Sequence, residues 1–349
     1  MWIIGCDYHP RFQQIAYVNT EGGEWGQRRL AHGGEAEGFY RSLRGQTVRV
    51  GMEASGHSRW FERLLEGLGH ELWIGDAARI RAAVVRKQKT DARDAEHLLE
   101  LLLSGRFERL RVWVPGAEAR DVRQLVLHRH RLIGMRTRVK NQLKAVALNE
   151  GLGPKPGLWS KPGQEQFRAL VLPAWTERRR QDNLELLAEL ERRTDPLDEA
   201  VMQQAQQRPE AVRLMTHPGV GPVTALTYVL VLGDPRRFAC GKQVASYVGL
   251  IPSEGSSGGR QRLGHITKQG NALLRTLLVE AGHVAARREP ELGRCYRRLA
   301  MKKNCGVAAV AVARKLAVRL WWMWMREVDY GQWRASGSHA GTGPVQPVG

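Results

Sequence analysis

The sequence predicts an α/β amino-terminal domain, a helical coiled-coil middle and a mainly α-helical carboxyl-terminal domain. Strand-like and helix-like segments alternate over residues 1–115, which is typical of an α/β layer domain. Apolar residues then recur every seven positions on a long basic helix, and helical patterns dominate from residue 208. The 349 residues are enough for two or three such domains.

The amino-terminal domain is predicted over residues 1–115. In the segment TVRVGMEAS, for example, apolar residues alternate with polar residues or glycine, which is the two-residue period of a strand. We expect strands within residues 1–9, 13–20, 24–32, 47–55 and 70–76, and helices within residues 34–45, 57–69 and 89–105.

The middle section, residues 116–207, is predicted to be a helical spacer that could also dimerise. Its first apolar seam consists of Leu125, Leu132, Val139 and Val146, and a second consists of Leu187, Leu190, Leu197 and Val201. Between them, residues 151–173 contain four prolines and four glycines, so they are predicted to be a linker. Pro196 is expected to kink or interrupt the second helix, and Arg178, Arg179 and Arg180 to form a patch that binds a nucleic-acid backbone.

The carboxyl-terminal domain is predicted over residues 208–333, with a disordered tail at 334–349. A turn containing Gly219 and Gly221 joins two helical stretches, as in a helix-hairpin-helix whose backbone N–H groups approach a phosphate. An ordinary helical hairpin is the alternative. The apolar stretch 306–324 is interrupted by Arg314, Lys315 and Arg319, which predicts a buried helix rather than a membrane span.

The composition favours a polyanionic partner. Lys and Arg number 54 against 35 Asp and Glu, a net charge of +19. Nucleic acid is the first candidate and an anionic membrane surface the second. The four cysteines form no C-x-x-C pair, and the amino terminus has no signal-peptide pattern. We therefore expect a cytoplasmic protein without a zinc site.

Four carboxylates are placed where they could meet. Asp7 and Glu53 end strands, while Asp91 and Asp94 lie three residues apart at the start of a helix. Each alone could be a cap or a solvated helix start. Four together would need hard cations, and oxygen ligands favour Mg²⁺ or Mn²⁺. Two such ions about 4 Å apart are a recurrent device for attacking a phosphodiester, and the order Asp–Glu–Asp–Asp is that of ribonuclease-H-like and RuvC-like enzymes.

A glycine-rich loop carries the second group of candidate residues. The segment EGSSGGRQRLGHITKQG holds Ser256 and Ser257, followed by two glycines and by Arg260, Arg262, His265 and Lys268. Glycines let the backbone come close to a phosphate, and basic side chains would surround it. Either serine is a candidate nucleophile if its proton is removed. The alternative is a flexible phosphate-binding loop without chemistry.

Five motifs in order resemble one family. They are GCDYH, GMEASG, KTDARDAEHL, HPGVGPVTAL and SSGGRQRLGHITKQGN, and the similarity covers residues 3–325. Their order and spacing resemble the DEDD transposases of insertion-sequence family 110, and the double-serine loop is most similar to the 1111 subgroup.

The resemblance implies a DNA recombinase with a RuvC-like (ribonuclease-H-like) amino-terminal domain. Asp7, Glu53, Asp91 and Asp94 would be the acidic tetrad that binds Mg²⁺, with Mn²⁺ as a possible substitute. The serine of the carboxyl-terminal transposase domain would form a covalent 5′-phosphoserine link to DNA. Relatives are guided by a structured bridge RNA and act on donor and target DNA as tetramers, in which tetrad and serine meet across protomers.

Two choices stay open at this point. Ser257 directly precedes Gly258, which favours it as the nucleophile, whereas counting back from Lys268 selects Ser256. The runner-up function is a RuvC-like nuclease or junction resolvase that uses water as the nucleophile. A non-catalytic nucleic-acid-binding protein is the third.

Overall fold

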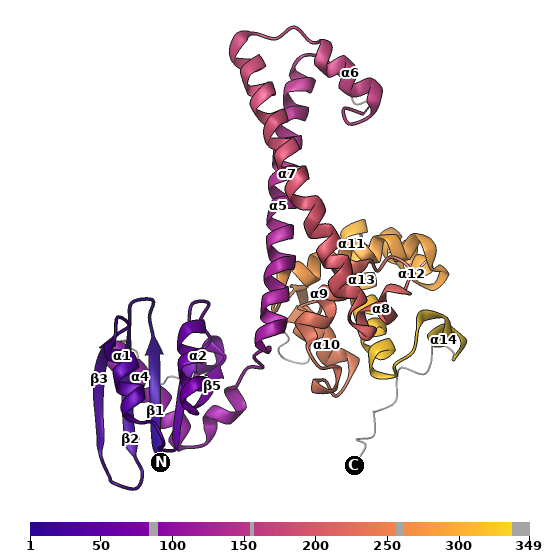
Figure 1. Cartoon of the computed structure of the whole chain (residues 1–349). Helices are drawn as coiled ribbons and strands as arrows, with labels where there is room; N and C mark the ends of the chain where they lie inside the picture. The colour runs from indigo at the N-terminus through magenta and orange to yellow at the C-terminus, as the bar shows by residue number, and fades with distance from the viewer. Residues whose placement is uncertain (84–89, 154–156, 256–261, 337–349) are drawn as a thin grey trace. The chain divides into compact units, whose positions relative to one another are not determined.

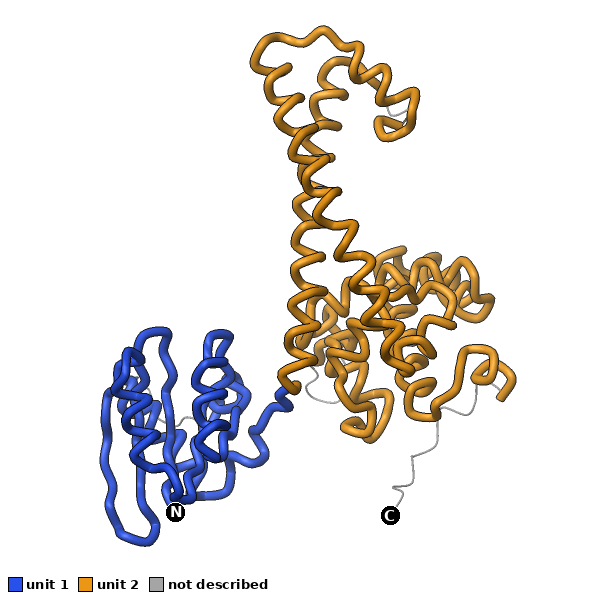
Figure 2. The backbone as a smooth tube through the Cα atoms, in the orientation of Figure 1, with its two compact units in different colours: residues 1–114 blue, residues 115–349 orange. Residues whose placement is uncertain are grey.

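The computed structural model describes residues 1–83, 90–153, 157–255 and 262–336. These residues form two compact units, Met1–Val114 and Pro115–Gly349 (Figure 2). The finer division of the second unit at residues 207 and 333 stays a prediction.

Unit 1 contains a five-stranded sheet in the order β3-β2-β1-β4-β5 (Figure 1). Strands β1 and β2 pair antiparallel, as do β2 and β3, whereas β4 is parallel to β1 and β5 is parallel to β4. Four of the five lie within the expected segments, and β2 begins one residue before its segment: β1 Trp2–Tyr8, β2 Phe12–Asn19, β3 Trp25–Ala31, β4 Val48–Glu53 and β5 Glu71–Gly75.

Helices cover both faces of this sheet. Even-numbered residues of β1, such as Ile4, are buried with the helices α1 (Glu35–Ser42) and α2 (Arg59–Leu68). Ile3 instead packs with helix α4 (Asp91–Leu103), so α4 covers the opposite face. These three helices were expected. The short helices α3 (Ala77–Ala82) and η1 (Arg106–Leu110) were not, since six or five residues are too few to show a helical period.

Unit 2 begins with an arm of two long antiparallel helices, α5 (Ala117–Asn149) and α7 (Ala174–Gln206) (Figure 1). Most residues of both predicted seams are buried, including Leu132 of α5 and Leu187 of α7. The Lys140–Glu191 ion pair, 3.0 Å long, also joins the helices. The seams therefore meet each other within one chain, while supercoiling and dimerisation stay predictions.

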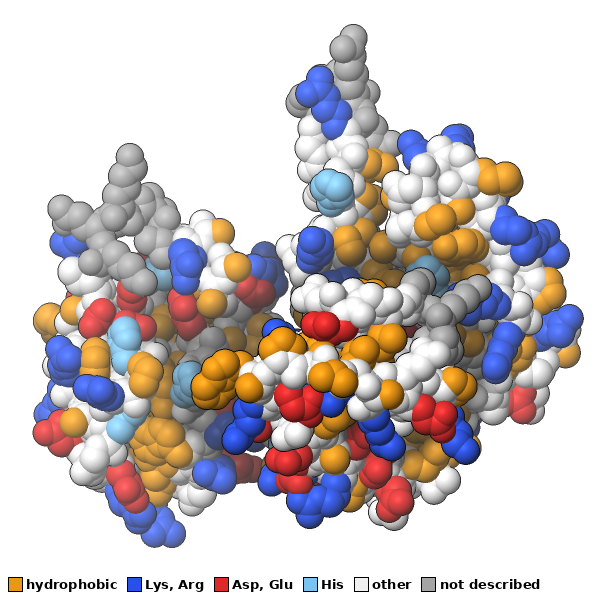
Figure 3. All heavy atoms as spheres, turned by 90° about the horizontal axis from the view of Figure 1, so that it is seen from above, with side chains coloured by type: hydrophobic (Ala, Val, Ile, Leu, Met, Phe, Trp, Pro, Cys, Tyr) orange, Lys and Arg blue, Asp and Glu red, His pale blue; other side chains and the backbone are white. Residues whose placement is uncertain are grey.

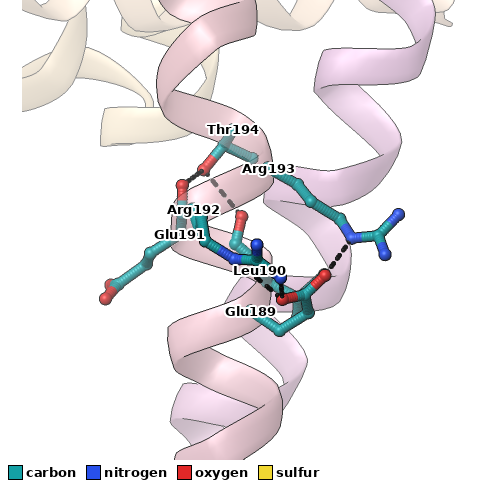
Figure 4. A network of polar contacts seen from close by, with 6 residues as sticks. All are labelled: Glu189, Leu190, Glu191, Arg192, Arg193 and Thr194. Carbon is teal, nitrogen blue, oxygen red and sulfur yellow. Dashed lines mark hydrogen bonds and ion pairs between the residues drawn. The ribbon is translucent and has the colours of Figure 1, made fainter.

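Pro196 lies inside α7 and does not interrupt it, so the expected interruption is wrong, while the expected kink stays a prediction. A proline removes one backbone N–H donor from a helix. Here the turn before it has other bonds: the Thr194 hydroxyl donates to the carbonyl of Leu190 at 2.9 Å, and Arg192 and Arg193 both pair with Glu189 (Figure 4). Packing against α5 adds to these bonds, since Leu197 lies against the apolar cluster that the two helices share.

Helix α6 (Lys161–Ala169) lies inside the segment that was predicted as a linker. The Ser160 hydroxyl caps it by accepting from the backbone N–H of Gly163, and Pro162 in its first turn needs no N–H partner. Phe167 is buried against the end of the arm. Proline and glycine therefore mark the start of a helix here, as well as the turns around it.

The remainder of unit 2 is mainly helical, as expected. Helix α9 is buried along its whole length apart from its first turn, and α13 contributes the buried Trp321 and Trp322 to the same core. Among the described residues, no helix is long and apolar enough to cross a membrane. The elements are α8 Pro209–Met215, α9 Pro222–Leu232, η2 Pro235–Arg237, α10 Gly241–Tyr247, β6 Pro252–Glu254, β7 Leu263–Ile266, α11 Ala272–Arg288, α12 Pro290–Lys302, α13 Cys305–Met325 and α14 Tyr330–Ala335.

Candidate active site

Asp7 and Glu53 end neighbouring strands at the same edge of the sheet. Strands β1 and β4 are parallel, and Cys6 pairs with Met52, so Asp7 and Glu53 follow side by side. Both are half-buried. Because side chains alternate along a strand, both lie on the face of Gly5, which is the face that α4 covers.

Helix α4 brings two further carboxylates to this place. The Thr90 hydroxyl caps the helix by accepting from the N–H of Arg93, so that Asp91 and Asp94 fall in the first turn. Gly5 permits a close approach of the helix to β1. A Cβ atom at this position would lie 2.3 Å from the carbonyl oxygen of Ala95.

Asp7, Asp91 and a histidine form the closest group. Nε2 of His9 lies 3.0 Å from Oδ2 of Asp7 and 3.7 Å from Oδ1 of Asp91. One ligand atom from each of the three residues lies within 4.8 Å of the other two. Figure 3 shows acidic and histidine side chains next to one another on the face of unit 1 that it draws.

His9 is a site residue that the sequence analysis missed. It lies just beyond β1, where its backbone N–H donates to the carbonyl of Phe12 at 2.9 Å. The available signal was its position two residues after Asp7, because residues i and i+2 of an extended chain share a face.

The electrostatics of Asp7 reflect this crowding. Burial raises the pKa of its carboxyl; the charge and hydrogen bond of His9 lower it, and the charges of Asp94 and Asp91 raise it further. Asp94 therefore belongs to the same electrostatic cluster as Asp7 and Asp91. A divalent cation would offset this repulsion.

The predicted serine loop belongs to unit 2. Ser256, Ser257 and Arg260 lie outside the described residues. Their described flanks are the antiparallel strands β6 and β7, and the N–H of Gly255 donates to the carbonyl of Arg262 at 3.0 Å. The sequence analysis did not predict these strands, because they are only three and four residues long.

His265 and Lys268 line a cavity of about 1110 Å³ beside this hairpin. Its walls are largely apolar, with Ile266 of β7 and Trp322 of α13 among them. Four further cationic side chains also line it, Arg298, Arg314, Lys315 and Arg319, together with one carboxylate, Glu291. The cavity therefore combines apolar walls with the positive charge expected around a phosphate.

Gly219 and Gly221 occupy the turn between α8 and α9, as expected. Gly219 has φ +90°, and a Cβ atom there would lie 2.6 Å from the carbonyl oxygen of Ala281 in α11. The positive φ and the close packing against α11 thus explain why position 219 is a glycine, without any contact to a phosphate. Gly221 is exposed at the amino terminus of α9, with no heavy atom within 4 Å of an added Cβ.

Two models of known protein families match the parts of the chain that contain these candidate sites. A family model described as "Transposase IS116/IS110/IS902 family" matches residues 211–297, and the IS110 DEDD model, described as "Transposase", matches residues 4–150. A "Probable family 20 transposase" from Pseudomonas aeruginosa is 30% identical over 94% of this chain and 98% of its own. The chain belongs to the IS116/IS110/IS902 family of transposases.

Two further relatives carry similar names. A "Putative transposase y4pF/y4sB" from Sinorhizobium fredii is 31% identical, over 81% of this chain and 74% of its own. The "Transposase for insertion sequence element IS1111A" from Coxiella burnetii is 27% identical, over 81% of this chain and 80% of its own. A transposase of an insertion sequence cuts and rejoins DNA.

The donor set in unit 1 of this transposase fits a divalent metal ion. Carboxylate oxygens from β1 and α4 converge with an imidazole nitrogen, and Asp7 is in part removed from water. Carboxylates bind hard cations such as Mg²⁺, and imidazole is a common ligand of Mn²⁺ and later transition metals. Asp7, Asp91 and His9 are the residues that could hold such an ion, with Asp94 and Glu53 beside them.

Proposed function

We propose that this transposase is a RuvC-like recombinase of the IS1111 subgroup that cuts DNA through a 5′-phosphoserine intermediate. The observation that carries the proposal is the convergence of Asp7 and Asp91 at the end of β1, with Asp94 close enough to raise the pKa of Asp7. The strand order β3-β2-β1-β4-β5, with β4 parallel to β1, supports a ribonuclease-H-like domain.

In the proposed reaction, the hydroxyl oxygen of Ser257 or Ser256 forms a bond to the phosphorus of the scissile phosphodiester. The bond to the 3′ oxygen breaks, and the 3′-hydroxyl leaves with the proton that the serine gave up. One phosphoester bond replaces another, so rejoining needs no ATP. A bound Mg²⁺ would supply positive charge to the transferring phosphate.

Side chains of the chain would position the DNA for this step. Asp7, Glu53, Asp91 and Asp94 would hold the metal. Arg260, Arg262, His265 and Lys268 would contact the phosphate next to the serine, as their spacing around the loop suggests. The cationic lining of the cavity beside β7 supports this assignment, since Lys268 shares it with Arg298 and Arg314.

The proposed partners are donor and target DNA, a structured bridge RNA and further copies of the chain as a dimer or tetramer. The net charge of +19 supports binding to nucleic acids. Exposed apolar side chains support assembly: Val171 is 95% and Trp175 86% exposed near the end of the arm. We propose that the protein acts in the cytoplasm, at the nucleoid.

A covalent-trapping experiment tests the proposal. Full-length protein is incubated with end-labelled DNA from the borders of its own element and with the RNA transcribed from the adjacent non-coding DNA, and is then denatured. We expect a protein–DNA adduct that disappears in either Ser257→Ala or Ser256→Ala. Ser253→Ala is the matched control, because Ser253 bonds the carbonyl of His265 within the hairpin and should keep the adduct.

The variant Asp91→Asn tests the acidic cluster in the same reaction. We expect adduct formation to fall on the order of 100-fold, as when one electrostatic contributor to a transition state is lost. Cleavage by the wild type without an adduct would instead support the nuclease or resolvase that uses water. DNA binding without cleavage, unchanged in Asp91→Asn, would support a non-catalytic binding protein.

A further inference from the structure

His9 reaches into the acidic cluster from a fixed position. Its ring stacks on Phe12, with 4.6 Å between the ring centroids and 22° between the planes. The guanidinium of Arg29 lies over the same Phe12 ring, 3.7 Å from its centroid. Stacking restricts how the imidazole can turn. Phe12 of β2 and Arg29 of β3 therefore help to hold Nε2 of His9 toward Asp7 and Asp91.

We propose that His9 is a nitrogen ligand of the divalent metal ion held by Asp7 and Asp91. The inference rests on the proposed function, in which this cluster binds a metal. Two ligand atoms that are each about 2.1 Å from one ion, at a right angle, lie about 3.0 Å apart. Nε2 of His9 and Oδ2 of Asp7 have this separation, and the 3.7 Å between Nε2 and Oδ1 of Asp91 corresponds to a wider angle.

The alternative role for His9 is to orient Asp7 through a hydrogen bond, without binding a metal. In that role its ring would need to face only the carboxylate of Asp7. Instead, Nε2 lies near two carboxylates from different elements, the end of β1 and the start of α4. Three groups that converge on one point from two elements are typical of a metal site, whereas a single hydrogen bond needs only two groups.

A nitrogen ligand changes which ion the site prefers. An all-oxygen set suits Mg²⁺, whereas imidazole binds Mn²⁺ and later first-row metals more readily. The site of this transposase is therefore expected to favour Mn²⁺ over Mg²⁺ more strongly than four carboxylates alone would.

Pulsed electron paramagnetic resonance tests the inference without relying on activity. Full-length protein is stripped of metal with a chelator and titrated with Mn²⁺, and the spin-echo modulation from ¹⁴N is recorded. We expect the coupling of a directly bound nitrogen in the wild type and its loss in His9→Asn, whose amide can offer only an oxygen. The affinity for Mn²⁺ should fall at least about tenfold in this variant, and that for Mg²⁺ by less.

Two variants separate the possible failures. His128→Gln, at an exposed position on α5, should leave binding and coupling unchanged. Asp91→Asn should weaken Mn²⁺ binding whatever the role of His9. Bound Mn²⁺ without ¹⁴N coupling, or with coupling that persists in His9→Asn, would overturn the inference and leave the metal cluster standing. Absence of Mn²⁺ binding by the wild type would overturn both.

Discussion

Gly5 is the residue at which helix α4 comes closest to strand β1. A Cβ atom there would lie 2.3 Å from the carbonyl oxygen of Ala95 and 2.4 Å from the backbone nitrogen of Leu99. Backbone atoms of a helix cannot rotate away as a flexible side chain can. The missing side chain at Gly5 therefore lets α4 carry Asp91 and Asp94 up to Asp7.

Substitution of Gly5 by alanine should damage both stability and the metal site. We expect Gly5→Ala to destabilise unit 1 by about 2–3 kcal/mol, because overpacking forces the helix away from the sheet. The affinity for Mn²⁺ should also fall, since Asp91 moves with the helix. Urea unfolding followed by circular dichroism, together with a Mn²⁺ titration, measures the two effects.

Gly38 in helix α1 provides the matched control for this change. It is exposed, and no heavy atom lies within 4 Å of an added Cβ. Gly38→Ala should therefore stabilise the helix by about 0.5–1 kcal/mol, because glycine loses more backbone entropy on folding than alanine. If Gly5→Ala behaved like Gly38→Ala, the close approach of α4 would not be what holds the cluster together.

The placement of the four candidate carboxylates at strand ends and a helix start was predictable, whereas the contact of His9 with two of them was not. Asp7 and Glu53 follow from the two-residue alternation that ends their strands, and Asp91 and Asp94 from helical spacing. The position of His9 two residues after Asp7 places the two on one face, but its contact with Asp91 depends on how α4 packs. Packing of this kind leaves no periodic pattern in a sequence.

At the scale of elements, long periodic segments were predicted well and short capped ones were not. The expected helices α1, α2 and α4 and most strands of unit 1 bury a repeating apolar face, whereas β3 buries Leu30 alone and is held by its pairing with β2. Helix α6 was hidden by its prolines and glycines, although Ser160 and Pro162 are favourable at a helix start. The hairpin β6–β7 depends on pairing between its strands, which neither strand encodes alone.

The basic run at the start of α7 is divided between surface and interior. Arg178 is exposed and pairs with Asp182, as expected for a surface patch. Arg180 is only 9% exposed; it donates to the carbonyls of Phe167 at 2.6 Å and Leu170 at 3.3 Å, where α6 ends. Arg180 therefore fastens α6 to the arm, and the prediction that it contacts nucleic acid is corrected.

Loss of Arg180 should loosen α6 without affecting DNA binding. We expect amide hydrogen exchange in α6 to become roughly 10–100-fold faster in Arg180→Met, because two buried carbonyls lose a charged donor. Arg178→Met removes only an exposed pair and should change exchange by no more than a few-fold. Equal effects of the two variants on exchange in α6, or a loss of DNA affinity only in Arg180→Met, would contradict this assignment.

At the scale of the whole molecule, the net charge of +19 does not say where a polyanion binds. Some arginines are neutralised in part: Arg192 and Arg193 share the one carboxylate of Glu189 on α7 (Figure 4). Lys and Arg side chains also lie around apolar surface in unit 2, as Figure 3 shows, and Arg298 and Arg314 line the cavity beside β7. Replacing Arg192 and Arg193, or Arg298 and Arg314, lowers the net charge by the same two units. Comparing DNA binding by the two double variants therefore separates the effect of total charge from the effect of where the charges lie.

The double variant Arg298→Ala/Arg314→Ala should weaken DNA binding and lower its salt dependence. Each phosphate contact contributes about 0.9 to the slope of log affinity against log salt, so the loss of two contacts should reduce the slope by about 2. Arg192→Ala/Arg193→Ala should have a much smaller effect on the slope, because both side chains are held by Glu189 on α7 and neither lines the cavity. Fluorescence anisotropy with labelled DNA from about 50 to 200 mM salt measures both slopes. If the two double variants lost affinity equally, attraction by the total charge would account for binding. The cavity would then not be the place where the phosphate backbone binds.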